Sequence, residues 1–458
     1  MSAMVSTPTR RASCVFESGK RSARYTAAIA AILLRVIRRV SAPAIYPWVF
    51  GPLQLGLVLE LFGFWPRWIP IAGGMALAGF LTVLAIVRER WRLKGALLML
   101  VIGLLTIAPT ISAMVTRAHV GITSMNEDSA IQTELAVERF LHGQPFYGIN
   151  WSGTVLAKMP WVVSLAPTNP ALHHFVYFPL VVLSAVPVRL LTGAVGLPFD
   201  YRMVLLCFVA IGLFAVWFLP IAASDRVAIA AALFLNPFVT LYLWTGRNDL
   251  CFAGLILLAL GMMARARMVS ASLTVGFAAA IKLFAAPAIP ILLFVLWLRF
   301  RRTRDRRELV LSLVALAAFP IVTILPFVLQ SPAAFFRDVV LYPGGGMPDS
   351  YPIHGLGLGG ILLLVGVVHH QDYFPFGLFQ AVAMAAAAWF GFRWLWVRPT
   401  LRRWMVVYVA LFLGLAFFAR YFNDSHLGIL VAMALTCRPL GDYVLPATAE
   451  RAELAKAA

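Results

Sequence analysis

The chain has 458 residues, of which 61% are apolar and only 12% charged, and this composition excludes a soluble globular protein. The 38 Lys and Arg residues outnumber the 19 Asp and Glu residues, which gives a formal net charge of +19. Most of the basic residues lie in short runs between apolar segments, as the positive-inside rule and anionic lipids require. We therefore expect membrane lipids, and no nucleic acid, as partners.

The N-terminal segment differs from the rest of the chain. Residues 1–26 are polar and Arg-rich, and residues 27–40 mix Leu and Ile with Arg, which predicts a cytosolic tail and an interfacial amphipathic helix. We assign 1–42 to this basic unit, 43–441 to a transmembrane domain and 442–458 to a cytosolic tail. The four cysteines are far apart and have no metal-binding or disulfide spacing, so we predict no metal ligands, and we expect no cofactor.

Apolar segments recur through the transmembrane domain. A bilayer core takes about 20 apolar residues to cross, so the pattern predicts an all-α polytopic protein with about 12 to 13 transmembrane helices. The predicted spans are 44–64, 67–87, 95–115, 174–193, 201–222, 227–245, 249–264, 269–285, 286–299, 308–329, 374–396, 404–421 and 425–441.

The Arg-rich runs indicate which ends of these spans face the cytosol. These runs are at 88–94, 265–267, 299–307 and 398–403. With these runs inside, the loops 116–172 and 330–354 lie on the outer face. The segments 355–370 and 174–193 do not fit as full crossings; a re-entrant or shallow helix at 355–370 removes the conflict, and the prolines in 174–193 allow a half-crossing. Such backbone is tolerated only where protein or a water-filled cavity covers it, which predicts an outer cavity.

The outer loop 116–172 is long for a membrane protein, and long ordered loops are usually functional. Ser124 and Glu127 have the spacing of a capping box and precede a helical apolar pattern, which predicts an amphipathic helix over about 126–141. The cap and the helix dipole are enough to explain an acidic residue at position 127 without a catalytic role. Asp128 is not needed by the cap, and its carboxylate suits a base that deprotonates an acceptor hydroxyl.

Several short motifs follow in a fixed order. They are G-x-P-x-Y at 143–147, Y-x-P at 177–179, N-P at 236–237 before the turn 245–249, and I-K at 281–282 followed by Pro287. In this order, after an acidic loop helix, they resemble the GT-C superfamily of membrane glycosyltransferases. The resemblance is closest to glycosyltransferase family 87 and covers roughly residues 95–425.

The resemblance implies a GT-C-like bundle and an inverting glycosyltransferase. Such an enzyme moves a sugar, for which mannose is the best single guess, from a polyprenyl-phosphate donor to a hydroxyl of a lipid-linked or cell-envelope glycan. The reaction is expected on the extracytoplasmic side of the plasma (inner) membrane, with a loop carboxylate as base. Asp128 is our first choice for this base, and Glu127 is the alternative.

The departing phosphate requires positive charge or hydrogen-bond donors in a site sheltered from water. The candidates for binding the donor phosphate or sugar are Tyr177, Arg247, Lys282, His354, Arg420 and His426. Lys282 lies in an apolar run, where a cation usually faces a cavity or a partner, so a structural ion pair is the alternative to a functional role. The turn that contains Arg420 and His426 is explained equally by solvation. Lys282 and His354 form our preferred pair.

The main alternative function is a transporter or flippase of lipid-linked sugars. Charged residues within the membrane favour it. The missing internal repeat and the acidic amphipathic helix in the outer loop disfavour it.

Overall fold

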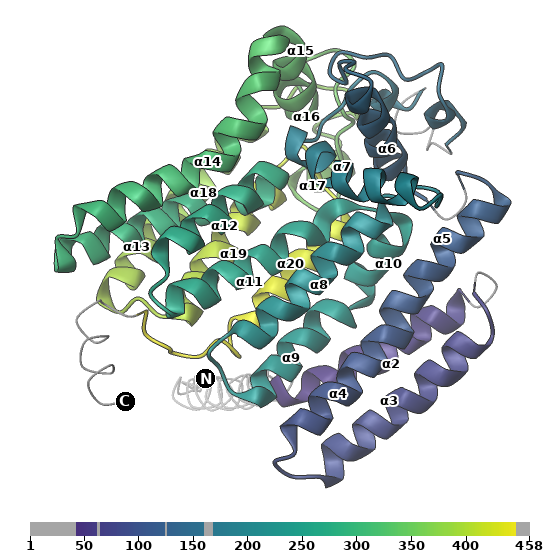
Figure 1. Ribbon diagram of the computed structural model, residues 1–458. Helices are drawn as coiled ribbons and strands as arrows, with labels where there is room; N and C mark the ends of the chain where they lie inside the picture. Colours follow the sequence, from purple (N-terminus) through teal and green to yellow (C-terminus); the bar gives the residue numbers. More distant parts are fainter. Residues whose placement is uncertain (1–42, 62–64, 124–125, 160–167, 446–458) are drawn as a thin grey trace, which may run out of the picture.

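The computed structural model describes residues 43–61, 65–123, 126–159 and 168–445, which form one helical bundle (Figure 1). In this part of the chain the strands are limited to β1 (His354–Gly355) and β2 (Tyr421–Phe422), which pair in parallel. The prediction of an all-α protein is therefore confirmed. The helix predicted at 27–40 lies outside the described residues.

The N-terminal helices form one flank of the bundle. They are η1 (Pro43–Ile45), α2 (Tyr46–Glu60), α3 (Trp68–Ile86), α4 (Trp91–Ile102), the π-helical turn η3 (Gly103–Ile107) and α5 (Ala108–Val120). The segments α4, η3 and α5 follow one another without a break. Large apolar side chains such as Ile71 and Met75 are exposed on α3, which suits contact with lipid rather than water.

The outer loop contains α6 (Asp128–Leu141), η4 (Val155–Lys158) and η5 (Pro170–Leu172). One face of α6 buries Ile131 and Val137, so the predicted amphipathic helix is confirmed. Glu138 of α6 forms an ion pair with Arg189 of the following helix, which holds the two helices together.

The central helices include α11, which packs mainly against α8 and α12. They are α7 (Pro179–Ala194), α8 (Arg202–Phe218), α9 (Ala223–Phe234), α10 (Pro237–Thr245), η6 (Asn248–Leu250), α11 (Cys251–Ala264), α12 (Met268–Ile281) and η7 (Leu283–Ala285). The chain bends by 50° between α9 and α10. Pro237 cannot continue the helix that precedes it, and Asn236 caps α10 by accepting the Phe238 N–H at 3.1 Å.

The C-terminal helices complete the bundle. They are α13 (Ala288–Thr303), α14 (Arg306–Gln330), α15 (Pro332–Phe336), η8 (Arg337–Leu341), α16 (Tyr342–Gly344), α17 (Leu358–Leu364), α18 (Phe376–Val397), α19 (Leu401–Phe417) and α20 (Asp424–Thr436). The Ile353 N–H donates to the His370 carbonyl at 2.7 Å, so residues 353 and 370 lie side by side. The segment 355–370 therefore turns back, as predicted, instead of crossing.

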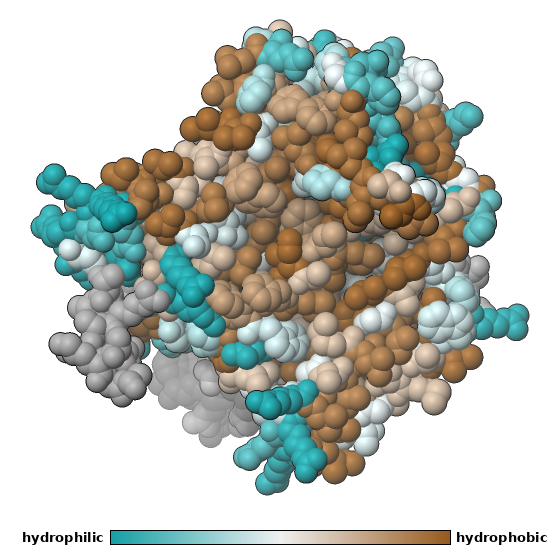
Figure 2. All heavy atoms as spheres, in the orientation of Figure 1, coloured by the Kyte–Doolittle hydropathy of each residue, from teal (hydrophilic) through white to brown (hydrophobic). Residues whose placement is uncertain are grey.

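Five helices of the described residues are long and apolar enough to span a membrane, or six if the bent pair α9 and α10 forms one span. The five are Trp68–Ile86, Trp91–Val120, Leu283–Thr303, Arg306–Gln330 and Phe376–Val397. Figure 2 shows apolar residues over the middle of the bundle and hydrophilic residues gathered toward its ends. The protein is a multi-pass membrane protein, and several of the other predicted spans are shorter apolar helices.

The two ends of the bundle differ in composition. The turn between α3 and α4 and the turn between α13 and α14 contain the arginine-rich runs, and both lie at the lower and left side of Figure 1. The helices α6, α15 and α16 lie together at the opposite end. The predicted outer loops are thus gathered at one end, away from these two runs.

Candidate active site

The first turn of α6 positions two adjacent carboxylates. Glu127 occupies the N-cap position in extended backbone and not the third helical position, so α6 does not begin with the predicted capping box, whose Ser124 lies outside the described residues. The Glu127 N–H instead donates to the Thr245 carbonyl at 2.8 Å, and its carboxylate lies 3.4 Å from Arg247. Burial raises the pKa of Glu127, and the positive charge of Arg247 opposes part of that rise. Glu127 thus joins α6 to the end of α10.

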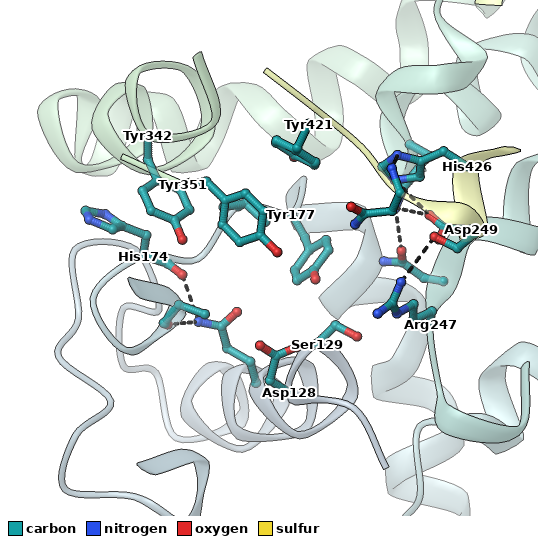
Figure 3. Close-up of a pocket in the computed structure, with 17 residues that line it drawn as sticks. Asp128, Ser129, His174, Tyr177, Arg247, Asp249, Tyr342, Tyr351, Tyr421 and His426 are labelled. Atoms are coloured by element: carbon teal, nitrogen blue, oxygen red, sulfur yellow. Dashed lines mark hydrogen bonds and ion pairs between the residues drawn. The ribbon is translucent and has the colours of Figure 1, made fainter. Parts of the chain in front are cut away.

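Asp128 faces the polar pocket beside α6 (Figure 3). Its Oδ2 accepts a hydrogen bond from the Asn169 Nδ2 at 3.2 Å. Among the described residues no cation forms an ion pair with it, in contrast to Glu127. As the first residue of α6, it lies at the N-terminal end of the helix, where the helix dipole is positive. Asp128 is therefore an anchored carboxylate with lone pairs available to a ligand.

The pocket has a volume of about 120 Å³ and is lined by polar side chains from distant parts of the chain. Its lining comprises Asp128, Ser129, Gln132, Ala171, His174, Val176, Tyr177, Arg247, Asn248, Asp249, Lys282, Tyr342, Tyr351, Tyr421, Asn423, Ser425 and His426. Figure 3 shows Asp128 and Ser129 on one wall, with Asp249 and His426 across the pocket. The sequence motifs at 177, 245–249 and 281–282 thus meet in one place.

Lys282 provides a positive charge on one wall of the pocket. It follows the last residue of α12 in extended backbone, and its Nζ lies 2.7 Å from Asn248 Oδ1 and 2.7 Å from Asp249 Oδ1. Asp249 is buried, so this ion pair neutralises a carboxylate that would otherwise be costly. The sequence predicted that a lysine in an apolar run has an ion-pair partner or faces a cavity. Lys282 does both, because it pairs with Asp249 and lines the pocket.

Arg247 and His426 extend the same wall. The Arg247 guanidinium lies 3.4 Å from Glu127, donates to Ser425 Oγ at 3.3 Å, and stacks over the Tyr242 ring at 4.5 Å. His426 is the N3 residue of α20, where its Nδ1 accepts the Asn423 N–H at 3.3 Å. Its Nε2 lies 3.9 Å from Asp249. The wall therefore combines two cations, a histidine and a buried carboxylate.

Besides Glu127, two of the predicted residues, His354 and Arg420, do not line this pocket. His354 lies in β1, where its Nδ1 contacts the Pro352 carbonyl at 2.9 Å and its ring stacks on Tyr421. Arg420 is 2% exposed and donates to the backbone carbonyls of Tyr351, Asp372 and His370. Both residues thus hold the segment 351–372 against the start of β2, behind the pocket wall.

An apolar cavity of about 500 Å³ adjoins the polar pocket. The two share Val176, Tyr177, Lys282, Tyr421 and His426 in their linings. The remaining lining is mainly apolar and includes Phe178, Leu283, Phe284, Val340, Phe376 and Leu415, with Arg420 at its edge. Leu283 and Val340 are also exposed on the surface of the bundle. The cavity can therefore admit an apolar chain from the membrane, with Lys282 and His426 at its polar end.

His174 is a pocket residue that the sequence did not single out. Its Nδ1 lies 3.0 Å from Asp338 and its Nε2 3.0 Å from Asp349, while its ring stacks on Tyr342 at 4.2 Å. Burial alone would lower the pKa of His174, but the hydrogen bonds that its ring donates to the two carboxylates outweigh burial and raise that pKa. A neutral imidazole has one N–H, so only the protonated ring donates to both carboxylates. No sequence signal marks this cluster, because His174 lies more than 160 residues from both carboxylates along the chain.

Fold and site define a class: a multi-pass membrane protein whose polar pocket shares a wall with an apolar cavity, an arrangement that suits an amphipathic substrate. The model of glycosyltransferase family 87 matches residues 175–419, more than half of the chain. The chain therefore belongs to this family and is a glycosyltransferase, as the order of its motifs implied. No curated protein and no solved structure matches it. The matched residues include Tyr177, Arg247 and Lys282, whereas α6 precedes them.

Proposed function

We propose that the protein is an inverting glycosyltransferase that takes a sugar, mannose as our best choice, from a polyprenyl-phosphate donor. The acceptor is a hydroxyl of a lipid-linked or cell-envelope glycan at the extracytoplasmic face of the plasma membrane. The observation that carries this proposal is the apolar cavity that meets the polar pocket at Lys282 and His426. A polyprenyl chain fits the apolar part, and its phosphate then lies beside the cation.

Asp128 acts as the base in this proposal. It takes the proton from the acceptor hydroxyl as the acceptor oxygen attacks the anomeric carbon. The bond from that carbon to the phosphate oxygen breaks, and the oxygen leaves with the electron pair as polyprenyl phosphate. Lys282, with Arg247 and His426 on the same wall, stabilises the charge that develops on the phosphate. A base and a phosphate site on opposite walls suit attack from the face opposite the leaving group, which inverts the anomeric centre.

Glu127 is the less suitable base because it forms an ion pair with Arg247 and lies outside the lining of the pocket. Arg420 and His354 support the donor site indirectly in this scheme, by holding the backbone behind Tyr421. Membership of a glycosyltransferase family favours sugar transfer over the transporter alternative.

The test compares Asp128→Asn with Glu127→Gln in the purified, reconstituted protein. A carboxamide cannot accept the hydroxyl proton, so we expect Asp128→Asn to reduce transfer from polyprenyl-phosphate mannose by at least 100-fold, within the range attributed to a general base, roughly 10²–10⁴. Asn169 can still form a hydrogen bond with the substituted side chain, so thermal stability should be nearly unchanged.

Glu127→Gln is the matched control, because it removes the neighbouring charge and weakens only the contact with Arg247. We expect it to retain most of the activity. Loss of transfer in Glu127→Gln with normal turnover in Asp128→Asn would move the base by one residue. Normal turnover in both variants would refute the proposed role of this helix.

A further inference from the structure

We propose that Tyr342 positions the acceptor, and that the acceptor presents a sugar ring to it. The Tyr342 hydroxyl donates a hydrogen bond to that ring on the side of the pocket away from Lys282. This inference rests on the proposed function, since it names the part of the same pocket that the acceptor occupies.

The Tyr342 hydroxyl is a buried polar group without a partner. The residue is 1% exposed, and no hydrogen-bond partner for its oxygen lies among the described residues. A buried hydroxyl left unpaired destabilises the fold, so such groups normally have a hydrogen-bond partner. Tyr342 lines the polar pocket. A ligand in the pocket is therefore the partner that this hydroxyl lacks.

The ring of Tyr342 is fixed in position. It stacks on His174 with 4.2 Å between ring centroids, and it meets Tyr351 edge-on at 5.9 Å. The Tyr351 N–H also donates to the Tyr342 carbonyl at 3.2 Å. Because His174 is itself held by Asp338 and Asp349, the hydroxyl cannot turn away to find another partner. The site is thus built to present this oxygen.

The pocket divides into two halves around Asp128. Lys282, Arg247 and His426 occupy the half that joins the apolar cavity. Tyr342 lines the polar pocket but not the apolar cavity, and Figure 3 shows the hydroxyls of Tyr342, Tyr351 and Tyr177 pointing toward the helix that carries Asp128. A donor with its phosphate at Lys282 leaves the half lined by Tyr342 and Tyr351 for the acceptor. The acceptor hydroxyl then lies between these tyrosines and Asp128.

The chemistry of this half fits a carbohydrate. Aromatic rings pack against the C–H faces of a sugar, and their hydroxyls form hydrogen bonds with its oxygens. Among the residues that the structure describes, the cationic side chain in this half is His174, and it is held between two carboxylates, so it is not free to bind an anionic acceptor. The Gln132 amide is also occupied, because it donates to the carbonyls of Ala171 and His174 at 2.7 and 2.8 Å. Tyr342, with Tyr351 beside it, is therefore placed to recognise a neutral, hydroxyl-rich ring.

The test is Tyr342→Phe in the full-length protein in lipid nanodiscs. The acceptor probes are octyl mannoside, octyl glucoside and octyl galactoside, and 1-octanol serves as the control without a sugar ring. We expect Tyr342→Phe to raise the acceptor KM for the preferred octyl glycoside about tenfold, since one hydrogen bond to a neutral group is lost. The KM for polyprenyl-phosphate mannose should stay the same. The melting temperature without ligand should be equal or higher, because the variant removes an unpaired hydroxyl.

Tyr46→Phe is the matched control, because its hydroxyl already donates to the Leu435 carbonyl at 3.0 Å, far from the pocket. It should lower the melting temperature and leave the acceptor KM unchanged. An unchanged acceptor KM in Tyr342→Phe would overturn the inference, as would a lower melting temperature, which would indicate a protein partner for the hydroxyl. Equal use of 1-octanol and octyl glycosides would also overturn it.

Binding of the octyl glycosides, measured without donor by thermophoresis, separates this inference from the proposed function. If the wild-type protein transfers no sugar from polyprenyl phosphate but binds an octyl glycoside about tenfold more tightly than Tyr342→Phe does, the proposed donor is wrong and the acceptor site stands. If the wild type transfers sugar and the two proteins bind glycosides equally, only the role of Tyr342 is refuted.

Discussion

Lys282 combines a structural and a chemical role at the boundary of the two cavities. With its side chain 16% exposed, it neutralises the buried Asp249 at 2.7 Å and still faces the pocket. A phosphate that enters the pocket therefore meets a cation already held in place, near the carboxylate of Asp249. Because His426 also contacts Asp249, at 3.9 Å, the charge on this wall is shared by three residues. A substitution of Lys282 alone cannot distinguish loss of donor binding from loss of the ion pair.

A pair of substitutions separates the two roles. Lys282→Met leaves Asp249 buried without its cation, so we expect a loss of about 3–5 kcal/mol of unfolding free energy. It should also raise the donor KM about 10- to 100-fold, because a charged hydrogen bond to phosphate is lost. The double variant Lys282→Met with Asp249→Asn should recover most of the stability but not the donor KM. Thermal unfolding and donor titration measure the two quantities, and recovery of donor KM in the double variant would leave Lys282 with a structural role only.

At the scale of secondary-structure elements, the site depends on how α6 rests against the end of α10. Gly246 follows α10 with a φ of +93°, a conformation that favours glycine. A Cβ at this position would lie 2.7 Å from the Ala130 Cβ and 3.0 Å from Asn126 Oδ1. The Glu127 N–H also donates to the Thr245 carbonyl here. The glycine therefore sets the distance between Asp128 on α6 and Arg247 on the facing turn.

Gly246→Ala should push α6 away from this turn and misplace Asp128. We expect kcat to fall at least tenfold, since a displacement of about 1 Å in a catalytic group can cost roughly 100-fold. The control is Gly366→Ala, because Gly366 also has a positive φ of +72° but has nothing within 4 Å of an added Cβ. In both variants an alanine must adopt a positive φ, which is unfavourable, so both should melt at a lower temperature than the wild type. Normal kcat in Gly246→Ala would show that the close contact does not position the base.

The sequence predicted the positions of the helices better than the tertiary contacts between them. Long apolar runs such as 308–329 and 374–396 correspond to α14 and α18, because span length and hydropathy are local properties of the chain. The start of α6 was predicted through a capping box, but tertiary contacts with Thr245 and Arg247 replace the cap. His174 was missed because its partners Asp338 and Asp349 come from a different outer segment. Pairing over such distances leaves no periodicity to detect.

At the scale of the whole molecule, the position of the pocket defines which leaflet can supply the donor. The pocket and the polar end of the apolar cavity lie near α6 and α16, while the Arg-rich turns beside α3 and α13 lie at the other end of the bundle (Figure 1). An arginine excess marks the cytosolic side of a membrane protein. This arrangement supports our proposal that the donor is drawn from the outer leaflet. The orientation can be tested without any assumption about the reaction.

Single cysteines in a variant that lacks the four native ones should reveal the orientation. Asn150 and Pro348 are exposed in the two predicted outer loops, and Arg302 is exposed near the end of α13. In intact cells, an impermeant maleimide should label cysteines at 150 and 348, because the proposed orientation places both at the exterior of the plasma membrane. A cysteine at 302 should react only after permeabilisation, since the arginine-rich turn is expected in the cytosol. Labelling of 302 in intact cells, with 150 and 348 protected, would place the pocket on the cytosolic side. The donor would then have to be present in the inner leaflet, and the proposed acceptor outside the cell could not reach Asp128.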